Sequence, residues 1–265
     1  MVYPFVTNML GFSLLRFSTS VIITFEYMFR NKVVVITGAS RGIGRSIAEE
    51  FLMQGAIVLG VSKNTPQQKI TSRNYTHILQ DLSNAANIDM LASILGEKID
   101  HIDILVHCAG IKKRTTFEDA DADAWDITMA INLRTPYLLT QKLVHFLMPG
   151  SSIVFIASQA GVGYVTRSIE YGISKSGIIY LTKSLAKLLA VKGVRVNAIS
   201  PGRTYTDLTN YGMDTKKEKE ALANIPLRHI NTPEEIAQSV AFLCGPGSVN
   251  ITGQVISVDG GECIS

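Results

Sequence analysis

The chain has 265 residues, 46% of them hydrophobic, which is enough for one large domain with a sizeable core. The formal net charge of +3 is small and the basic residues are scattered, which argues against a nucleic-acid partner. The three cysteines, Cys108, Cys244 and Cys263, have neither metal-ligand spacing nor the pattern of a disulfide framework. We therefore expect no metal site and a reducing compartment, the cytoplasm.

The stretch 1–27 is the unusual part of the sequence. It is apolar and aromatic, with Arg16 and Glu26 as its charged residues. It lacks the basic start of a signal peptide, and no window reaches the roughly 18 uninterrupted apolar residues of a spanning helix. Three interpretations stay open: an extension upstream of a natural start at Met28, a segment that binds a membrane or a partner, or a targeting peptide.

Short apolar runs alternate with helical patterns from residue 32 onward. The runs predict strands over 32–37, 56–61, 76–79, 103–107, 152–157, 194–199 and 254–258. The helical patterns predict helices over 43–54, 84–95, 123–148, 171–191 and 233–244, with a bend at Pro136 and a cap at Thr232. This alternation predicts a single α/β domain, residues 28–265, with a doubly wound, Rossmann-like parallel sheet of about seven strands and helices on both faces. Such folds bind ligands at the carboxyl ends of their strands.

A glycine-rich turn follows the first predicted strand, with the sequence Thr37-Gly-Ala-Ser-Arg-Gly-Ile-Gly44. Its glycines permit a tight turn and a close backbone approach, and the helix that follows offers free amides to a phosphate. The GxxxGxG spacing differs from the GxGxxG of many dinucleotide binders. Its place after the first strand of an α/β domain favours phosphate binding over a plain strand-to-helix turn.

Tyr171 and Lys175 lie four residues apart on a predicted helix and therefore project from the same face. A phenol beside a cation ionises more easily than its reference pKa of about 10 suggests, and it can then exchange a proton near neutral pH. Ser158, from the end of the fifth predicted strand, could bind the same carbonyl oxygen of a substrate as the tyrosine phenol. The three residues predict a site for proton transfer.

Together with Pro201-Gly202, these motifs and their order resemble the short-chain dehydrogenase/reductase family over residues 31–262. The chain is most similar to the branch that includes 3-oxoacyl-carrier-protein reductases. The resemblance implies reduction of a carbonyl to an alcohol by hydride transfer, with Tyr171 as general acid and Ser158 holding the carbonyl oxygen. It implies that Lys175 lowers the pKa of the tyrosine and binds the nicotinamide ribose, while Asn132 orders a water relay to the lysine.

The resemblance also implies a nicotinamide cofactor. NAD-preferring relatives carry an acidic residue at the end of the second strand, where this chain has Ser62 and Lys63. These side chains suit a 2′-phosphate, and Arg41 can reach the same phosphate with its forked donors, so NADP(H) is preferred and NAD(H) stays possible. The other cofactor contacts that the resemblance implies, besides Tyr171 and Lys175, are Gly38, Ser40, Gly42, Ile43, Gly44, Asp81, Leu82, Cys108, Ala109, Gly110, Pro201, Gly202, Thr204 and Thr206.

Two residues depart from the family pattern. His107 and Cys108 stand where relatives have a pair of asparagines, and we expect both to be packed structural side chains.

The segment 205–223 is expected to be a lid over the substrate. Lys112-Lys113-Arg114 is interpreted as a solvated loop, with docking of an acidic partner as the alternative.

Substrate and partners are less well specified. Carrier-bound 3-oxoacyl groups are the default substrates that the resemblance implies, followed by free ketones, sugars or steroids. Relatives are usually tetramers, so we expect a homotetramer or homodimer that packs through the helices over 128–148 and 171–191, although their apolar positions would look the same if buried within one monomer. A non-catalytic nucleotide-binding or scaffold protein on the same fold is the alternative function.

Overall fold

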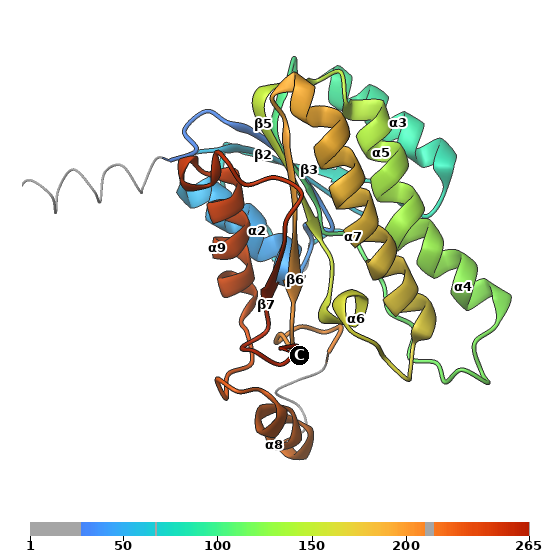
Figure 1. Cartoon of the computed structure of the whole chain (residues 1–265). Helices are drawn as coiled ribbons and strands as arrows, with labels where there is room; N and C mark the ends of the chain where they lie inside the picture. The colour runs from blue at the N-terminus through green and yellow to red at the C-terminus, as the bar shows by residue number, and fades with distance from the viewer. Residues whose placement is uncertain (1–27, 67, 210–214, 265) are drawn as a thin grey trace, which may run out of the picture.

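The computed structural model describes residues 28–66, 68–209 and 215–264, so the predicted extension over 1–27 lies outside the described residues. One parallel sheet has the strand order β3-β2-β1-β4-β5-β6-β7 (Figure 1). Its strands are β1 Val33–Thr37, β2 Ile57–Ser62, β3 Tyr75–Leu79, β4 Ile102–His107, β5 Leu147–Ile156, β6 Arg195–Pro201 and β7 Val255–Val258. The predicted fold class and its strands are confirmed.

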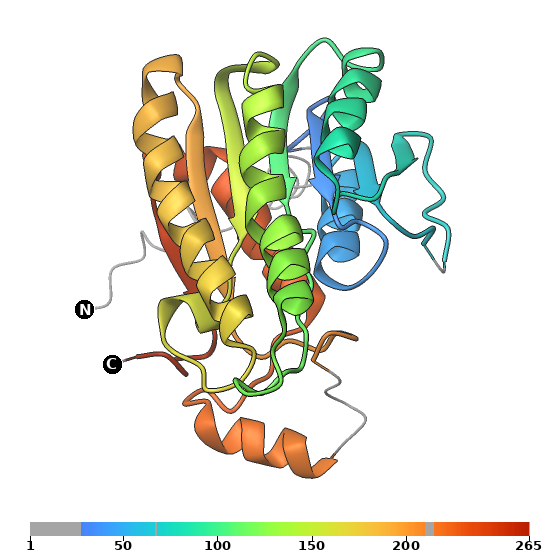
Figure 2. The same ribbon diagram turned by 90° about the vertical axis from the view of Figure 1, so that its right-hand side faces the viewer.

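Helices cover both faces of the sheet (Figures 1 and 2). One face carries α2 Gly42–Met53 and α9 Pro233–Cys244, and the other carries α3 Ala85–Gly96, α5 Thr135–Leu143 and α7 Ile169–Leu189. Strand β1 shows why its sequence is continuously apolar. Val34 and Ile36 join the core under α2 and α9, while Val33 and Val35 join the core under the other helices.

Shorter elements complete the described chain. The helices α6 Gln159–Val162 and α8 Thr215–Asn224 lie beyond the carboxyl ends of the strands (Figure 1). The one-turn elements η2 Ala190–Lys192 and η3 Pro246–Ser248 follow α7 and α9. Among the described residues, no helix is both long and apolar enough to cross a membrane.

The prediction of one helix over 123–148 is wrong in two respects. The segment contains α4 Ala122–Met129, a π-helical turn η1 Ala130–Arg134, and α5, which ends at Leu143. Leu147 already belongs to β5 and pairs with Ile102, because strand pairing with a distant segment overrides the local helical pattern. The irregular turn directly precedes Pro136 in the first turn of α5, and proline has no N–H for a regular α-helical bond.

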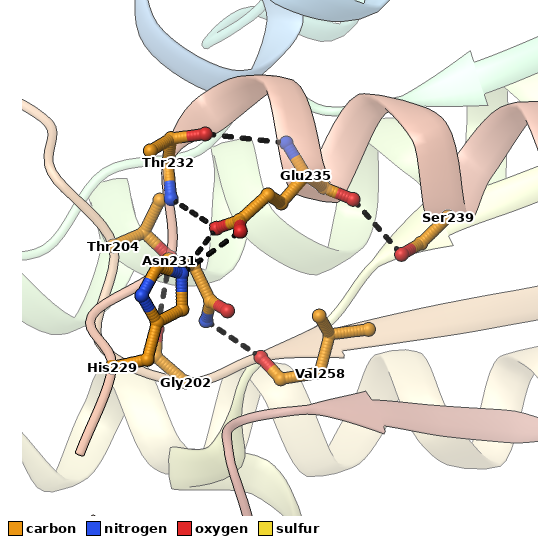
Figure 3. A network of polar contacts seen from close by, with 8 residues as sticks. All are labelled: Gly202, Thr204, His229, Asn231, Thr232, Glu235, Ser239 and Val258. Carbon is orange, nitrogen blue, oxygen red and sulfur yellow. Dashed lines mark hydrogen bonds and ion pairs between the residues drawn. The ribbon is translucent and has the colours of Figure 1, made fainter. Parts of the chain in front are cut away.

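A polar network anchors the segment between β6 and α9 (Figure 3). The backbones of Thr204 and Asn231 form a short parallel bridge, and the Asn231 amide donates to the Val258 carbonyl at 2.7 Å. The predicted cap at Thr232 is confirmed as a capping box with Glu235, whose carboxylate also pairs with His229 at 2.8 Å. The residue before the predicted lid and the segment 229–232 after it are therefore fixed to the sheet and to α9.

Candidate active site

A cavity of about 550 Å³ lies at the carboxyl ends of the strands. The loops after β1 to β6 all contribute to its wall, as the doubly wound topology predicts. Ser158, Tyr171 and Lys175 line it, and so does every predicted cofactor residue from Gly38 to Thr206. Asn132 does not line the cavity but lies behind the loop after β4.

The glycine-rich turn lies directly against the loop after β4. Gly38 has φ +77°, and a Cβ there would approach the Ala109 backbone to 2.8 Å, so no larger residue fits. The Thr37 hydroxyl joins the same two loops by accepting bonds from the amides of Cys108 and Ala109 at 3.1 and 3.2 Å. The junction fixes one wall of the cavity.

The N-terminus of α2 faces the cavity through Gly42 and its neighbours. Its N-cap, Arg41, makes no side-chain capping bond, and the first turn holds no acidic residue. The first amides of the helix are therefore not capped by a side chain, and together with the helix dipole they suit a phosphate. This part of the chain fits the pyrophosphate of a dinucleotide.

The predicted 2′-phosphate site already contains ion pairs. The Lys63 ammonium pairs with Asp81 at 2.8 Å and lowers the pKa of that carboxyl, and Arg41 pairs with Asp207 at 2.9 Å. Both pairs are largely exposed, so each contributes at most about 1 kcal/mol and can be exchanged for a phosphate. The Ser62 hydroxyl is buried, donates to the Asn64 carbonyl at 2.9 Å, and lies 2.7 Å from His77 Nε2.

Tyr171 and Lys175 are buried in the first turns of α7. The Lys175 ammonium donates to the Ile156 carbonyl at 2.7 Å and lies 5.7 Å from the centroid of the Tyr171 ring. The Ser158 side chain lies close enough to the tyrosine phenol to lower its pKa, and its oxygen accepts from the Ala160 amide at 3.2 Å. The spacing seen in the sequence thus brings a hydroxyl, a phenol and an ammonium to one wall.

Burial controls the protonation of this group. It raises the pKa of Tyr171, and Ser158 opposes that shift in part. It lowers the pKa of Lys175 to about 8. The direction for Tyr171 is opposite to the sequence-based expectation, because burial outweighs the opposing effect of Ser158. The phenol is therefore protonated and can donate at neutral pH.

Asn132 lies in the π-helical turn η1 and holds the loop after β4. Its side chain accepts from the Ile111 amide and donates to the Ile111 carbonyl, both at 2.9 Å, and it donates to the Ser174 hydroxyl at 3.1 Å. A Cβ on Gly110 would lie 3.4 Å from the Asn132 oxygen and 3.6 Å from the Lys175 nitrogen. Asn132 therefore positions the backbone beside Lys175, and the predicted water relay stays a prediction.

His107 and Cys108 pack as expected. The His107 ring stacks on Phe155 with centroids 4.8 Å apart, and its Nε2 lies 2.8 Å from the Thr140 hydroxyl. Burial lowers the pKa of His107 to about 3 and raises that of Cys108 to about 12, so both side chains are neutral. Among the described residues, no cluster of side chains could hold a metal ion.

The sequence interpretation missed several residues of the cavity wall, among them Lys112, Gln159, Arg203 and Asp207. Each follows a strand of the parallel sheet, and this position is the signal that could have identified them. Gln159 is notable because its buried side-chain oxygen has no partner within the described structure. The segment 205–223 contributes Leu208 to the wall, whereas residues 210–214 lie outside the described part.

Comparisons with known proteins show which family the chain resembles along most of its length. The family model described as Enoyl-(Acyl carrier protein) reductase matches residues 38–262. A 3-oxoacyl-[acyl-carrier-protein] reductase FabG from Thermotoga maritima is 33% identical over 242 residues, covering 88% of this chain and 98% of the relative.

Two solved structures are similar along nearly their whole length. A short chain dehydrogenase from Burkholderia cenocepacia in complex with NADP is 25% identical, with a TM-score of 0.80 over 89% of this chain and 99% of the other. A 4-hydroxyisoleucine dehydrogenase complexed with NADH is 29% identical, with a TM-score of 0.83 over 89% and 100%.

The depressed pKa of Lys175 predicts a specific pH dependence of stability. The unfolded chain binds a proton at Lys175 more tightly than the folded chain, so the free energy of unfolding rises as the pH passes through the folded pKa of about 8. From about pH 7 to 9.5 the wild type should gain about 2 kcal/mol relative to Lys175→Met in denaturant titrations. A difference between the two proteins that does not change with pH would contradict the buried, depressed ammonium.

Proposed function

The chain belongs to the short-chain dehydrogenase/reductase family of oxidoreductases, and on this basis we propose that it reduces a carbonyl to an alcohol with a Ser158-Tyr171-Lys175 site and NADP(H). One observation carries the proposal. A buried phenol that lies beside a serine hydroxyl and an ammonium shares a cavity with an uncapped helix N-terminus. The first group suits proton donation to a carbonyl oxygen and the second suits a dinucleotide phosphate.

Proton and electron transfer are divided between the cofactor and the chain. A bound nicotinamide supplies the hydride that the carbonyl carbon receives. Tyr171 donates its phenol proton to the carbonyl oxygen, so the C=O bond becomes a CH–OH group. Ser158 donates to the same oxygen as negative charge develops on it, and the Lys175 ammonium stabilises the resulting phenolate. The raised pKa of Tyr171 keeps the phenol protonated, which is the form that donates a proton to a carbonyl oxygen.

The residues at the far end of the cavity support NADP(H) over NAD(H). Arg41 and Lys63 line it and no carboxylate occupies position 62, where an acidic residue would repel a 2′-phosphate. Of the two similar structures, the short chain dehydrogenase carries NADP and the 4-hydroxyisoleucine dehydrogenase carries NADH, so the choice rests on these residues. Asp81 and Asp207 pair with the two cations until a phosphate replaces them.

The substrate is a small or carrier-bound carbonyl compound, and similarity to the FabG reductase favours a 3-oxoacyl thioester as the first to test. A cytoplasmic location agrees with the three free thiols. Recovery of the protein with membranes after cell fractionation would contradict that location.

We also infer self-association through α4, α5 and α7. Most of the apolar positions that suggested this interface, such as Leu139, Leu143 and Ile178, are buried inside the monomer and do not support it. Other apolar side chains on these helices support it because they are exposed: Trp125, Tyr137, Ile173, Tyr180 and Leu188. Such a surface is typical of an interface between copies.

Tyr171→Phe should nearly abolish carbonyl reduction, because it removes the proton donor and keeps the ring. Cofactor affinity should persist. We would measure NADPH oxidation with acetoacetyl thioesters and simple ketones, and cofactor binding by fluorescence, with Tyr180→Phe on the same helix as the control. Turnover near that of the wild type in Tyr171→Phe would remove this residue from the mechanism.

Replacing Arg41 by Ala, or Lys63 by Met, should raise the KM for NADPH about tenfold and leave the KM for NADH nearly unchanged, since only NADPH carries the 2′-phosphate. Lys98→Met, an exposed change outside the cavity, serves as the control. Equal effects on both cofactors would show that these cations do not distinguish them.

Tyr180→Asp should convert the protein to a smaller species in sedimentation velocity, because it places a charge within the exposed apolar face. Val249→Asp, at an exposed residue outside these helices, should not change the assembly. A monomeric wild type would rule out the proposed interface.

A further inference from the structure

Lys112 extends from the loop after β4 to the catalytic tyrosine. Its ammonium lies over the Tyr171 ring, 5.3 Å from the centroid, and the residue lines the cavity. The next residue, Lys113, is exposed, as Lys112 is, but does not line the cavity. The Lys113 carbonyl accepts a bond from the Ser168 hydroxyl at 2.6 Å, which fixes the loop in this arrangement. Two lysines that are neighbours in the sequence thus differ in their access to the site.

The other cations of the cavity wall are already engaged. Three of them pair with carboxylates and one donates to a carbonyl: Arg41 with Asp207, Lys63 with Asp81, Arg203 with Glu262 and Lys175 with the Ile156 oxygen. Within the described residues, no hydrogen bond or ion pair engages the ammonium of Lys112. Lys112 is therefore the cation of the described wall that a ligand can reach without displacing an ion pair or a hydrogen bond.

The surroundings of Lys112 carry excess positive charge. Partial burial lowers the pKa of Lys112, and Arg114 and Arg203 add to that shift, while Glu170 opposes it. Glu170 is itself buried and accepts a bond from the Thr115 hydroxyl at 3.1 Å. An anion beside Lys112 would offset both the desolvation of the ammonium and the repulsion from the two arginines.

We propose that Lys112 makes the site selective for carbonyl substrates that carry a carboxylate or phosphate within a few bonds of the reacting carbonyl. The inference rests on the proposed reductase function. The Lys112 ammonium lies over the same ring whose hydroxyl donates to the carbonyl oxygen. A substrate anion that pairs with this ammonium is therefore close to the reacting carbonyl. A phosphate at the far end of a carrier-protein arm is too many bonds away to occupy this place.

Pairs of a keto acid and its methyl ester test the proposal, because the two members differ in charge and share the carbonyl. The pairs are pyruvate, acetoacetate and levulinate with their methyl esters, in which the carboxylate lies progressively further from the ketone. We would measure kcat/KM with saturating NADPH for the wild type, Lys112→Met, Lys112→Arg and the matched control Lys113→Met. The KM for NADPH would be measured for each protein.

The wild type should prefer the acid over the ester by about tenfold at one spacing or more. Lys112→Met should bring this ratio close to one by raising the KM for the acid, with little change for the ester. Lys112→Arg and Lys113→Met should keep the preference.

Three results would overturn the assignment of Lys112: an acid preference that persists in Lys112→Met, a wild type that reduces esters without preferring any acid, and a rise in the KM for NADPH in Lys112→Met without loss of the acid preference. Failure to reduce any acid, ester or thioester would instead count against the reductase function. The two failures are therefore distinguishable.

Discussion

The cavity depends on the close approach of the loops that follow β1 and β4. The hydroxyl of Thr37 accepts bonds from two successive amides of the second loop, and Gly38 has no Cβ to separate them. A parallel sheet brings these carboxyl ends together, but a side chain at position 38 would keep the loops apart. Because Asn132 holds the same β4 loop from behind, the backbone beside Lys175 is fixed from both sides.

Burial gives the catalytic group its chemistry as well as its geometry. Removing Tyr171 and Lys175 from water moves their pKa values apart, because burial raises the pKa of the phenol and lowers that of the ammonium to about 8. The neutral phenol is thereby retained as a proton donor, and the ammonium is held by a single backbone carbonyl. The site thus carries an unfavourable lysine charge within the fold, as functional sites commonly do.

Much of the fold and of the candidate site could be predicted from sequence, because the parallel topology places the residues that follow each strand at one edge of the sheet. Gly38, Ser158 and Pro201 were found in this way. The direction of the Tyr171 pKa shift could not be predicted, since spacing along a helix does not reveal how deeply its face is buried. Nor could the sequence distinguish Lys112 from Lys113, or show that Leu147 pairs with a distant strand.

The π-helical turn at Ala130–Arg134 has a consequence for chain length. It contains more residues per turn than an α-helix, and Asn132 reaches the β4 loop from within it. The wider turn takes up about one extra residue, so α4 and α5 continue as one helix on either side of it. Deleting a residue from α5 would instead rotate everything before the deletion by about 100°, and Asn132 and α4 could not then keep their contacts. This helix therefore tolerates substitution at its exposed positions far better than it tolerates a change in the number of its residues.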